Sequence, residues 1–197
     1  VKHGYNLKHL MRTIMLSQTY RLSSLPNETN VADLKNYSRS YRRRLPAETL
    51  LDAVCAVTEV KETFSGLPPD ALAKQTWNHK LDSQFMDAFG RPNASSECPC
   101  ERDAKPSVVQ ALHLMNSSKL QEMLTSAKGR TTRLAKSTLN AQQIAEELYL
   151  ACYSRLPDAE ESAIAGKALD VGVQHRQAAI EDVLWSLLNS AEFVFNH

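Results

Sequence analysis

The chain has 197 residues, of which 23% are charged, and a formal net charge of +1. A chain of this length can bury a hydrophobic core without help from disulfides or metals. Its nearly balanced charge argues against a bulk affinity for nucleic acid or for an anionic membrane. No apolar run approaches the roughly 20 residues that a membrane span needs. We therefore expect a globular protein with no nucleic-acid partner and no membrane span in this chain.

The start of the sequence suggests a piece of a larger protein. The chain begins with valine, enters a helical pattern almost at once, and carries no visible signal peptide. We interpret residues 1–197 as a single helical domain that is a fragment of a longer protein. Four cysteines are too few for a disulfide scaffold of this size, so composition alone leaves the redox compartment open.

Apolar residues at helical spacing predict an irregular all-α bundle of six or seven helices. The first helix would follow an N-cap at Asn6, and Pro46 suits the first turn of the second. Further capping patterns begin at Ser118, Asn140 and Asp158. The apolar positions of the first helix share one face and are Leu7, Leu10, Met11, Ile14 and Met15.

Two finer details follow from the same pattern. Gly129 is placed to end the helix that starts near Ser118, since glycine is the commonest residue just past a helix end. In the helix after Asp158, the spacing predicts that Ile164, Ala168 and Val171 face the core.

A proline-rich stretch over about residues 65–106 lacks sustained periodicity and is predicted to be one long loop. Loops of this length inside a compact domain are usually functional, or are packed against the surface as a strap. This loop is therefore the first place in the chain where we expect a functional site.

The loop contains the sequence Cys98-Pro99-Cys100, which holds two of the four cysteines. A disulfide between these two would close a small, strained ring and would be easily reduced. Alternatively, each cysteine could bond to Cys55 or Cys152 and pin the loop onto a helix. Cys55 and Cys152 lie on apolar helical stripes, which also fits small buried residues.

A metal site is the remaining possibility for Cys98 and Cys100. Both thiolates could bind a metal together with two further ligands from His79, His113 or a carboxylate. Two cysteines without a second pair make a weak metal motif, and the identity of such a metal stays unknown.

Catalytic candidates near these cysteines are Glu101, Arg102, His113 and Asp87. Glu101 and Arg102 could act as an acid and an anion clamp. More commonly, however, such a pair anchors a loop to backbone groups, and a lone histidine beside an apolar face is usually structural. The sequence contains no Gly-rich phosphate loop, Gly-x-Ser-x-Gly or His-Glu-x-x-His motif.

A basic stretch precedes the second helix and contains Arg39, Arg42, Arg43 and Arg44 with two nearby tyrosines. Guanidinium groups bind phosphate, sulfate or carboxylate well, so the stretch could bind an anion. The alternative, which we favour, is a strap that pairs with acidic residues and lays its aliphatic stems on apolar surface.

Several stretches, taken together and in order, resemble one family. They are residues 7–14, 17–20, 37–39, 43–48, 89–92 (FGRP), 98–102 (CPCER), 110–116 (QALHLMN), 147–150, 154–157 and 181–193. The combination resembles the C-terminal part of the planctomycete domain of unknown function 1553 (DUF1553). Pro99 departs from this pattern, because family members often have an acidic residue there.

The resemblance implies a setting and no established reaction. Such domains lie at the end of large exported proteins, often after a planctomycete cytochrome c-like domain. The resemblance therefore implies that residues 1–197 are the C-terminal fragment of a larger multidomain protein. The resemblance thus implies a periplasmic or cell-surface location, which would favour oxidised cysteines and a disulfide. This chain has no Cys-x-x-Cys-His, so we expect no cofactor in this fragment and haem c only in other domains.

Three functions remain open at this stage. The first is a non-catalytic helical module for docking, assembly or ligand binding, with other domains of the parent protein as partners. The second is a carbohydrate-active or sugar-binding role in polysaccharide degradation. The third is binding of a polysaccharide or another polyanion through the basic stretch. We expect this fragment not to be an enzyme, although the residues alone leave that question open.

Overall fold

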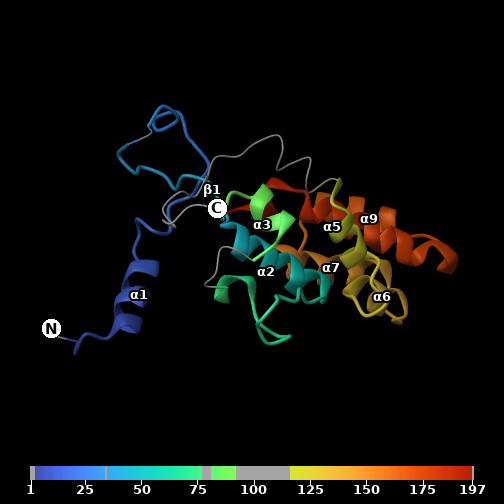
Figure 1. The fold of residues 1–197 in the computed structure, drawn as a ribbon. Helices are drawn as coiled ribbons and strands as arrows, with labels where there is room; N and C mark the ends of the chain where they lie inside the picture. The colour runs from blue at the N-terminus through green and yellow to red at the C-terminus, as the bar shows by residue number, and fades with distance from the viewer. Residues whose placement is uncertain (1–2, 34, 77–80, 92–115, 197) are drawn as a thin grey trace. The chain divides into compact units, whose positions relative to one another are not determined.

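The computed structural model describes residues 3–33, 35–76, 81–91 and 116–196. These residues are mostly helical, as predicted (Figure 1). The chain divides into two units, of which unit 1 comprises residues 1–43 with 195–197 and unit 2 comprises residues 44–194. Two short strands, β1 (Arg43–Arg44) and β2 (Phe195–Asn196), pair with each other.

The described residues of unit 1 contain one helix, α1 (Leu7–Met15). It begins as predicted, because the side chain of Asn6 accepts a hydrogen bond from the backbone N–H of His9 at 3.0 Å. Within the part of unit 1 that the structure describes, no hydrophobic side chain is buried. The predicted apolar face of α1 is therefore present, and its side chains are exposed.

Unit 2 contains the other helices of the described residues. They are α2 (Ala47–Thr58), η1 (Ala73–Gln75), α3 (Gln84–Ala88), α5 (Ser118–Leu124), α6 (Arg130–Ala135), α7 (Ala141–Tyr153), α8 (Ala159–Leu169), η2 (Val173–His175), α9 (Arg176–Leu188) and α10 (Ala191–Val194). The described residues form nine α-helices, whereas six or seven were predicted. The difference comes from α3 and α10, which are only about one turn long.

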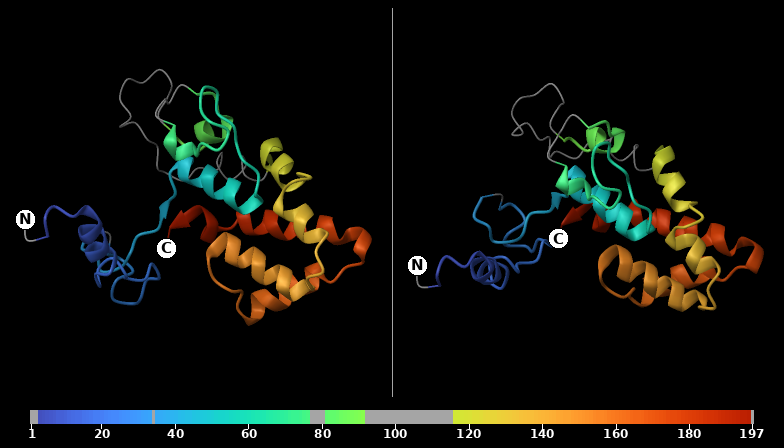
Figure 2. Two further views of the ribbon diagram at one scale, coloured as in Figure 1. Left: turned by 90° about the horizontal axis from the view of Figure 1, so that it is seen from below. Right: turned by 60° about the horizontal axis from the view of Figure 1, so that its bottom comes forward.

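Helix α9 organises unit 2. Figure 2 shows α9 (red) running between the α7–α8 pair (orange) and the helices α2 and α5. Its buried face carries Ile180, Leu184, Leu187 and Leu188, three of which have no exposed surface at all. Full burial of such side chains stabilises a fold by roughly 1.5–3 kcal/mol each, so α9 holds the layers on its two sides together.

Three predicted helix starts in unit 2 are confirmed, at Pro46, Asn140 and Asp158. Asn140 and Asp158 each form a capping box at the start of α7 and α8. Two details were wrong. The N-cap of α5 is Ser117, whose hydroxyl accepts from Leu120 N–H, and not Ser118. Gly129 is the N-cap of α6 and does not end α5, which stops at Leu124.

The core-facing side of α8 was also predicted wrongly. Ile164 and Val171 are 65% and 41% exposed, whereas Ala165 and Leu169 are buried. The buried stripe is shifted by one residue because α8 packs closely against α7 and α9. The small Ala165 is the residue that is buried, and the larger Ile164 is turned outward.

The longest described helices, α7 and α9, have 13 residues each. None of the helices in the described ranges meets the combination of length and hydropathy that a membrane span requires.

Candidate functional site

A cavity with a volume of about 660 Å³ lies among α2, α3 and α5 in unit 2. Leu51 and Phe85 form its apolar part, and both are buried. The remaining lining residues are polar or charged and are Glu62, Asp82, Ser83, Gln84, Asn116, Ser117, Ser118 and Lys119. Three separate stretches of the chain therefore deliver polar side chains to one cavity.

The charged groups of this cavity include one ion pair. Lys119 Nζ lies 3.2 Å from Glu62 Oε2. This carboxylate oxygen is buried and yet makes no hydrogen bond of good geometry in the structure. The hydroxyls of Ser83 and Ser117 accept the backbone N–H groups of Met86 and Leu120, at 3.3 and 3.2 Å. Because these hydroxyls accept with their oxygen, each retains a proton that it can donate.

Cys55 lies close to this cavity. Burial raises the pKa of the Cys55 thiol to about 11, and the nearby carboxylates of Glu62 and Asp52 add to the effect. Burial likewise raises the pKa of Cys152 to about 12. Both cysteines are half-buried and free in the structure. A thiol with a raised pKa is mostly protonated at neutral pH and reacts slowly, so both behave as packing residues.

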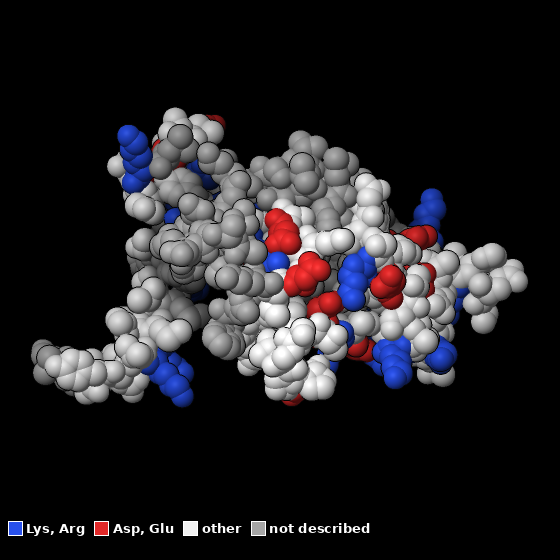
Figure 3. All heavy atoms as spheres, viewed as in Figure 1, with Lys and Arg blue, Asp and Glu red and all other residues white. Residues whose placement is uncertain are grey.

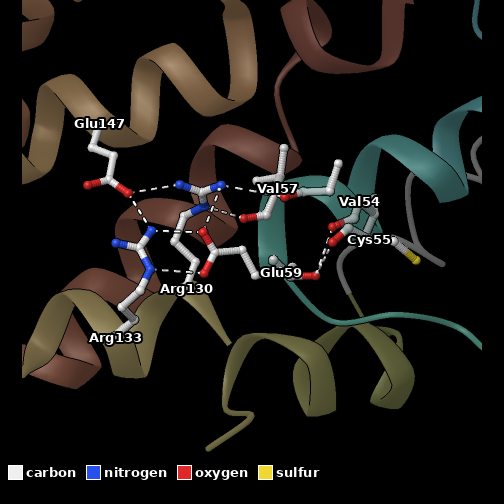
Figure 4. Close-up of polar contacts among 9 residues, drawn as sticks. Val54, Cys55, Val57, Glu59, Arg130, Arg133 and Glu147 are labelled. Atoms are coloured by element: carbon white, nitrogen blue, oxygen red, sulfur yellow. Dashed lines mark hydrogen bonds and ion pairs between the residues drawn. The ribbon is translucent and has the colours of Figure 1, made fainter. Parts of the chain in front are cut away.

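A second polar feature is an ion-pair cluster of Arg130, Arg133, Glu59 and Glu147 (Figure 4). Arg130 lies between the two carboxylates, with Nη1 2.9 Å from Glu147 Oε1 and Nη2 3.2 Å from Glu59 Oε1. Arg130 Nε also donates to the backbone carbonyl of Val57 at 2.6 Å. Arg133 donates to both oxygens of Glu59, at 3.0 and 2.8 Å.

This cluster fixes the end of α2. Glu59, the C-cap of α2, has a left-handed backbone (φ 60°), and the Arg130 side chain satisfies a carbonyl in the last turn of the helix. The hydrogen bonds from Arg133 lower the pKa of Glu59 below its usual range and raise that of Arg133. Two positive and two negative charges neutralise one another, so the cluster joins α2, α6 and α7 and has no excess charge for a ligand.

Arg155 plays a similar part just past the C-terminal end of α7. Its guanidinium binds both oxygens of Glu161 at 2.7 Å each and both oxygens of Glu192 at 2.7 and 2.8 Å. It also lies over the rings of Tyr149 and Tyr153, 5.7 and 5.4 Å from their centres. Its hydrogen bonds lower the pKa of Glu161 to about 2. Arg155 thus ties the starts of α8 and α10 to α7.

The predicted catalytic and cysteine candidates are only partly placed. Asp87 pairs with Arg91, the distance from Oδ1 to Nε being 2.5 Å, and the Arg91 side chain is only 5% exposed. Asp87 is therefore the counter-ion of a buried arginine. The other candidates lie outside the described residues and are Cys98, Cys100, Glu101, Arg102 and His113. Within the described ranges, no group of three or more His, Cys, Asp or Glu side chains is gathered for a metal.

The four arginines of the basic stretch are not equivalent. Arg39 and Arg42 both reach Ser24, which is buried, and Arg39 lies 5.1 Å from the centre of the Tyr41 ring. Arg43 is exposed and belongs to β1. Arg44 belongs to unit 2, donates to the carbonyl of Leu45, and lies 5.6 Å from the centre of the Phe89 ring.

The two units carry opposite charge, which the near-neutral total conceals. Residues 1–43 contain eight Lys or Arg and two Asp or Glu, a net charge of +6. Residues 44–197 contain fifteen Lys or Arg and twenty Asp or Glu, a net charge of −5. On the face of unit 2 seen in Figure 3, acidic and basic side chains are interspersed. A count over each segment of the sequence would have revealed this asymmetry.

One family model, described as a protein of unknown function (DUF1553), matches residues 1–169. The match extends to the end of α8 and thus includes α1, the cavity and the ion-pair cluster. No curated protein and no solved structure matches the chain.

Proposed function

Since the chain belongs to DUF1553, a family of proteins of unknown function, we propose a function from its own surfaces: it is a non-catalytic docking module. Its N-terminal unit binds a protein surface that is both acidic and apolar. The observation that carries this proposal is the combination, in residues 3–43, of strong positive charge with exposed hydrophobic side chains.

The apolar face of α1 supports this proposal most directly. Its five large hydrophobic side chains are between 48% and 72% exposed, and they are Leu7, Leu10, Met11, Ile14 and Met15. A contiguous exposed apolar face of this kind marks an interaction surface. A helix of nine residues is also marginally stable in water by itself. Burial against a partner would stabilise the helix and remove its apolar face from water.

The charges beside this face indicate the chemistry of the partner. A groove on α1 is lined by Lys8, Met11, Arg12, Met15 and Leu16. Its two cations lie one helical turn apart, next to the methionines. Methionine adapts its shape to a partner, and the cations favour carboxylates at the rim of the contact. A protein with apolar side chains bordered by Asp and Glu satisfies both features, whereas a pure polyanion satisfies only the charge.

The setting is part of the same proposal. We place the module in an exported multidomain protein with a cytochrome c-like domain, where another domain of the parent protein would be the docking partner. An exported location favours a disulfide that involves Cys98 or Cys100. Intact mass with thiol counting, with and without reductant, tests this directly: four free thiols in oxidising conditions would contradict it.

A designed peptide provides the test of docking. The probe is a fluorescent amphipathic helical peptide with leucines on one face and glutamates on both flanks. We expect it to bind the intact chain, and we expect binding to weaken in the double variant Leu10→Ser and Ile14→Ser. The charge-reversal variant Lys8→Glu and Arg12→Glu should weaken binding as well, and more strongly at low salt.

The matched control reverses two exposed lysines of unit 2, Lys128→Glu and Lys167→Glu, which changes the net charge by the same amount. If this control weakens binding as much as the change in α1, the attraction is unspecific and the proposal is wrong. Heparin provides the second comparison. Should the α1 variants weaken heparin binding and leave peptide binding intact, the partner is a polyanion and not a protein surface.

A further inference from the structure

We propose that the cavity among α2, α3 and α5 binds a neutral, polyhydroxylated ligand of the size of one or two sugar rings. All residues that carry this inference belong to unit 2, so it is independent of the docking proposed for unit 1. The cavity volume of about 660 Å³ lies within the 300–1,000 Å³ that is typical of small-molecule sites.

The cavity presents both polar and apolar surface, which suits the hydroxyl edges and the apolar C–H faces of a sugar ring. Among the described lining residues, Leu51 and Phe85 are apolar, and both are buried. Five neutral polar side chains also belong to the lining, and they are Ser83, Gln84, Asn116, Ser117 and Ser118.

The charges of the cavity argue against an acidic ligand. Glu62 and Asp82 contribute two negative charges, and Lys119 contributes one positive charge. The lysine is already paired with Glu62 at 3.2 Å. The described lining residues therefore carry a net charge of −1, which Asp82 leaves after Glu62 and Lys119 neutralise each other, so a phosphate or carboxylate ligand would meet net repulsion. A neutral ligand avoids this repulsion.

The arrangement of donors and acceptors matches hydroxyl groups. Each hydroxyl of a sugar both donates and accepts a hydrogen bond. Glu62 Oε2 is a buried acceptor that is ion-paired with Lys119 at 3.2 Å and has a second lone pair for a further donor. The hydroxyls of Ser83 and Ser117 are held in place because each accepts a hydrogen bond from a backbone N–H group. Each hydroxyl still has its own proton to donate. A ligand hydroxyl placed here would donate to the carboxylate and accept from a serine.

The experiment is a titration of the intact chain with neutral hexoses and their disaccharides, followed by saturation-transfer NMR. Glucose, galactose, mannose, cellobiose and maltose form the neutral panel, and glucuronate is the charged comparison. We expect at least one neutral sugar to bind at millimolar concentration and glucuronate to bind more weakly than glucose.

The variant Glu62→Gln keeps the shape of the side chain and removes its charge, and it should weaken binding of the best sugar about tenfold. Glu122→Gln, in α5 but outside the cavity lining, is the matched control and should leave binding unchanged. Unchanged circular dichroism in both variants confirms that they fold. Absence of binding by every neutral sugar, equal loss in both variants, or a preference for glucuronate would each overturn the proposal.

Discussion

The two units of the chain use the same kinds of residues in opposite ways. In unit 2, Arg130 and Arg155 each bind two carboxylates, and the apolar faces of α7 and α9 are buried. In unit 1, Arg39 and Arg42 both reach the small polar Ser24, and the apolar face of α1 is exposed. Unit 2 uses its charges and apolar surface to hold itself together, whereas in unit 1 the apolar face of α1 and cations such as Arg42 and Arg43 are exposed.

The comparison of α1 with α7 shows why periodicity alone does not reveal burial. Both helices carry apolar residues at helical spacing, and both start at an asparagine N-cap. Yet Leu148 in α7 has no exposed surface, whereas Leu10 in α1 is 54% exposed. An amphipathic pattern predicts that a helix will bury one face, but the partner for that face need not be within the chain.

The largest expected effect on stability comes from truncating a buried side chain in the core of unit 2. We expect Leu148→Ala to lower the free energy of unfolding by about 2–5 kcal/mol, because it leaves a cavity in a fully buried position. The matched change Leu10→Ala in α1 should lower it by less than about 0.5 kcal/mol, since that side chain buries little surface. Urea unfolding followed by circular dichroism measures both. Equal losses would show that α1 packs like a core helix.

The second largest expected effect is the loss of unfolding free energy when an arginine of either unit is replaced. Arg130→Met removes a side chain that is only 14% exposed together with its hydrogen bonds to Val57 and Glu147. We expect a loss of about 2–3 kcal/mol, because the carbonyl of Val57 loses its side-chain donor and a charge-assisted hydrogen bond to Glu147 is removed. Arg42→Met, whose side chain is exposed and donates to the hydroxyl of Ser24, should cost less than about 1 kcal/mol. Urea unfolding measures both variants. A larger loss of unfolding free energy in Arg42→Met than in Arg130→Met would contradict the proposed difference between the two units.

A smaller effect appears in the dependence of stability on pH. Arg155 lowers the pKa of Glu161 from 4.5 to about 2. The ion pair therefore contributes fully above pH 4.5, and its contribution is lost as the pH falls from about 4.5 to 2. In Arg155→Ala, the free energy of unfolding should fall less steeply over this range. Parallel pH profiles for the variant and the unmodified chain would contradict this assignment.

Sequence reasoning predicted those features of the fold that depend on neighbours in the chain. Asn6, Asn140 and Asp158 were predicted as caps because a cap needs only a side chain and an N–H three residues on. Which face of α8 is buried could not be predicted in the same way. Whether Ile164 or Ala165 faces inward depends on how closely α8 approaches its neighbours, which local spacing does not encode.

Polar contacts between distant segments of the chain likewise could not be predicted from local sequence. Arg130 reaches the carbonyl of Val57 across 73 positions of sequence, and no local pattern marks that contact. The cavity likewise combines Glu62, Ser83 and Lys119, which come from three separate segments. Asp87 was a candidate catalytic residue in the sequence, and only the structure identifies it as the partner of the buried Arg91. The charge asymmetry of the two units, by contrast, was visible in the sequence by segment counts.

Hydrogen–deuterium exchange of the intact chain, measured peptide by peptide, tests the central claim. This claim is that the apolar face of α1 is exposed in the chain alone and becomes buried when a partner binds. Amides buried by a core exchange slowly, while those of an uncovered helix exchange close to the rate of an unfolded chain. We predict fast exchange for residues 7–15 and strong protection for α7 and α9, with residues 7–15 becoming protected when the acidic amphipathic peptide is added. Protection of residues 7–15 as strong as that of α7 in the chain alone would show that α1 is already covered, and would contradict the account.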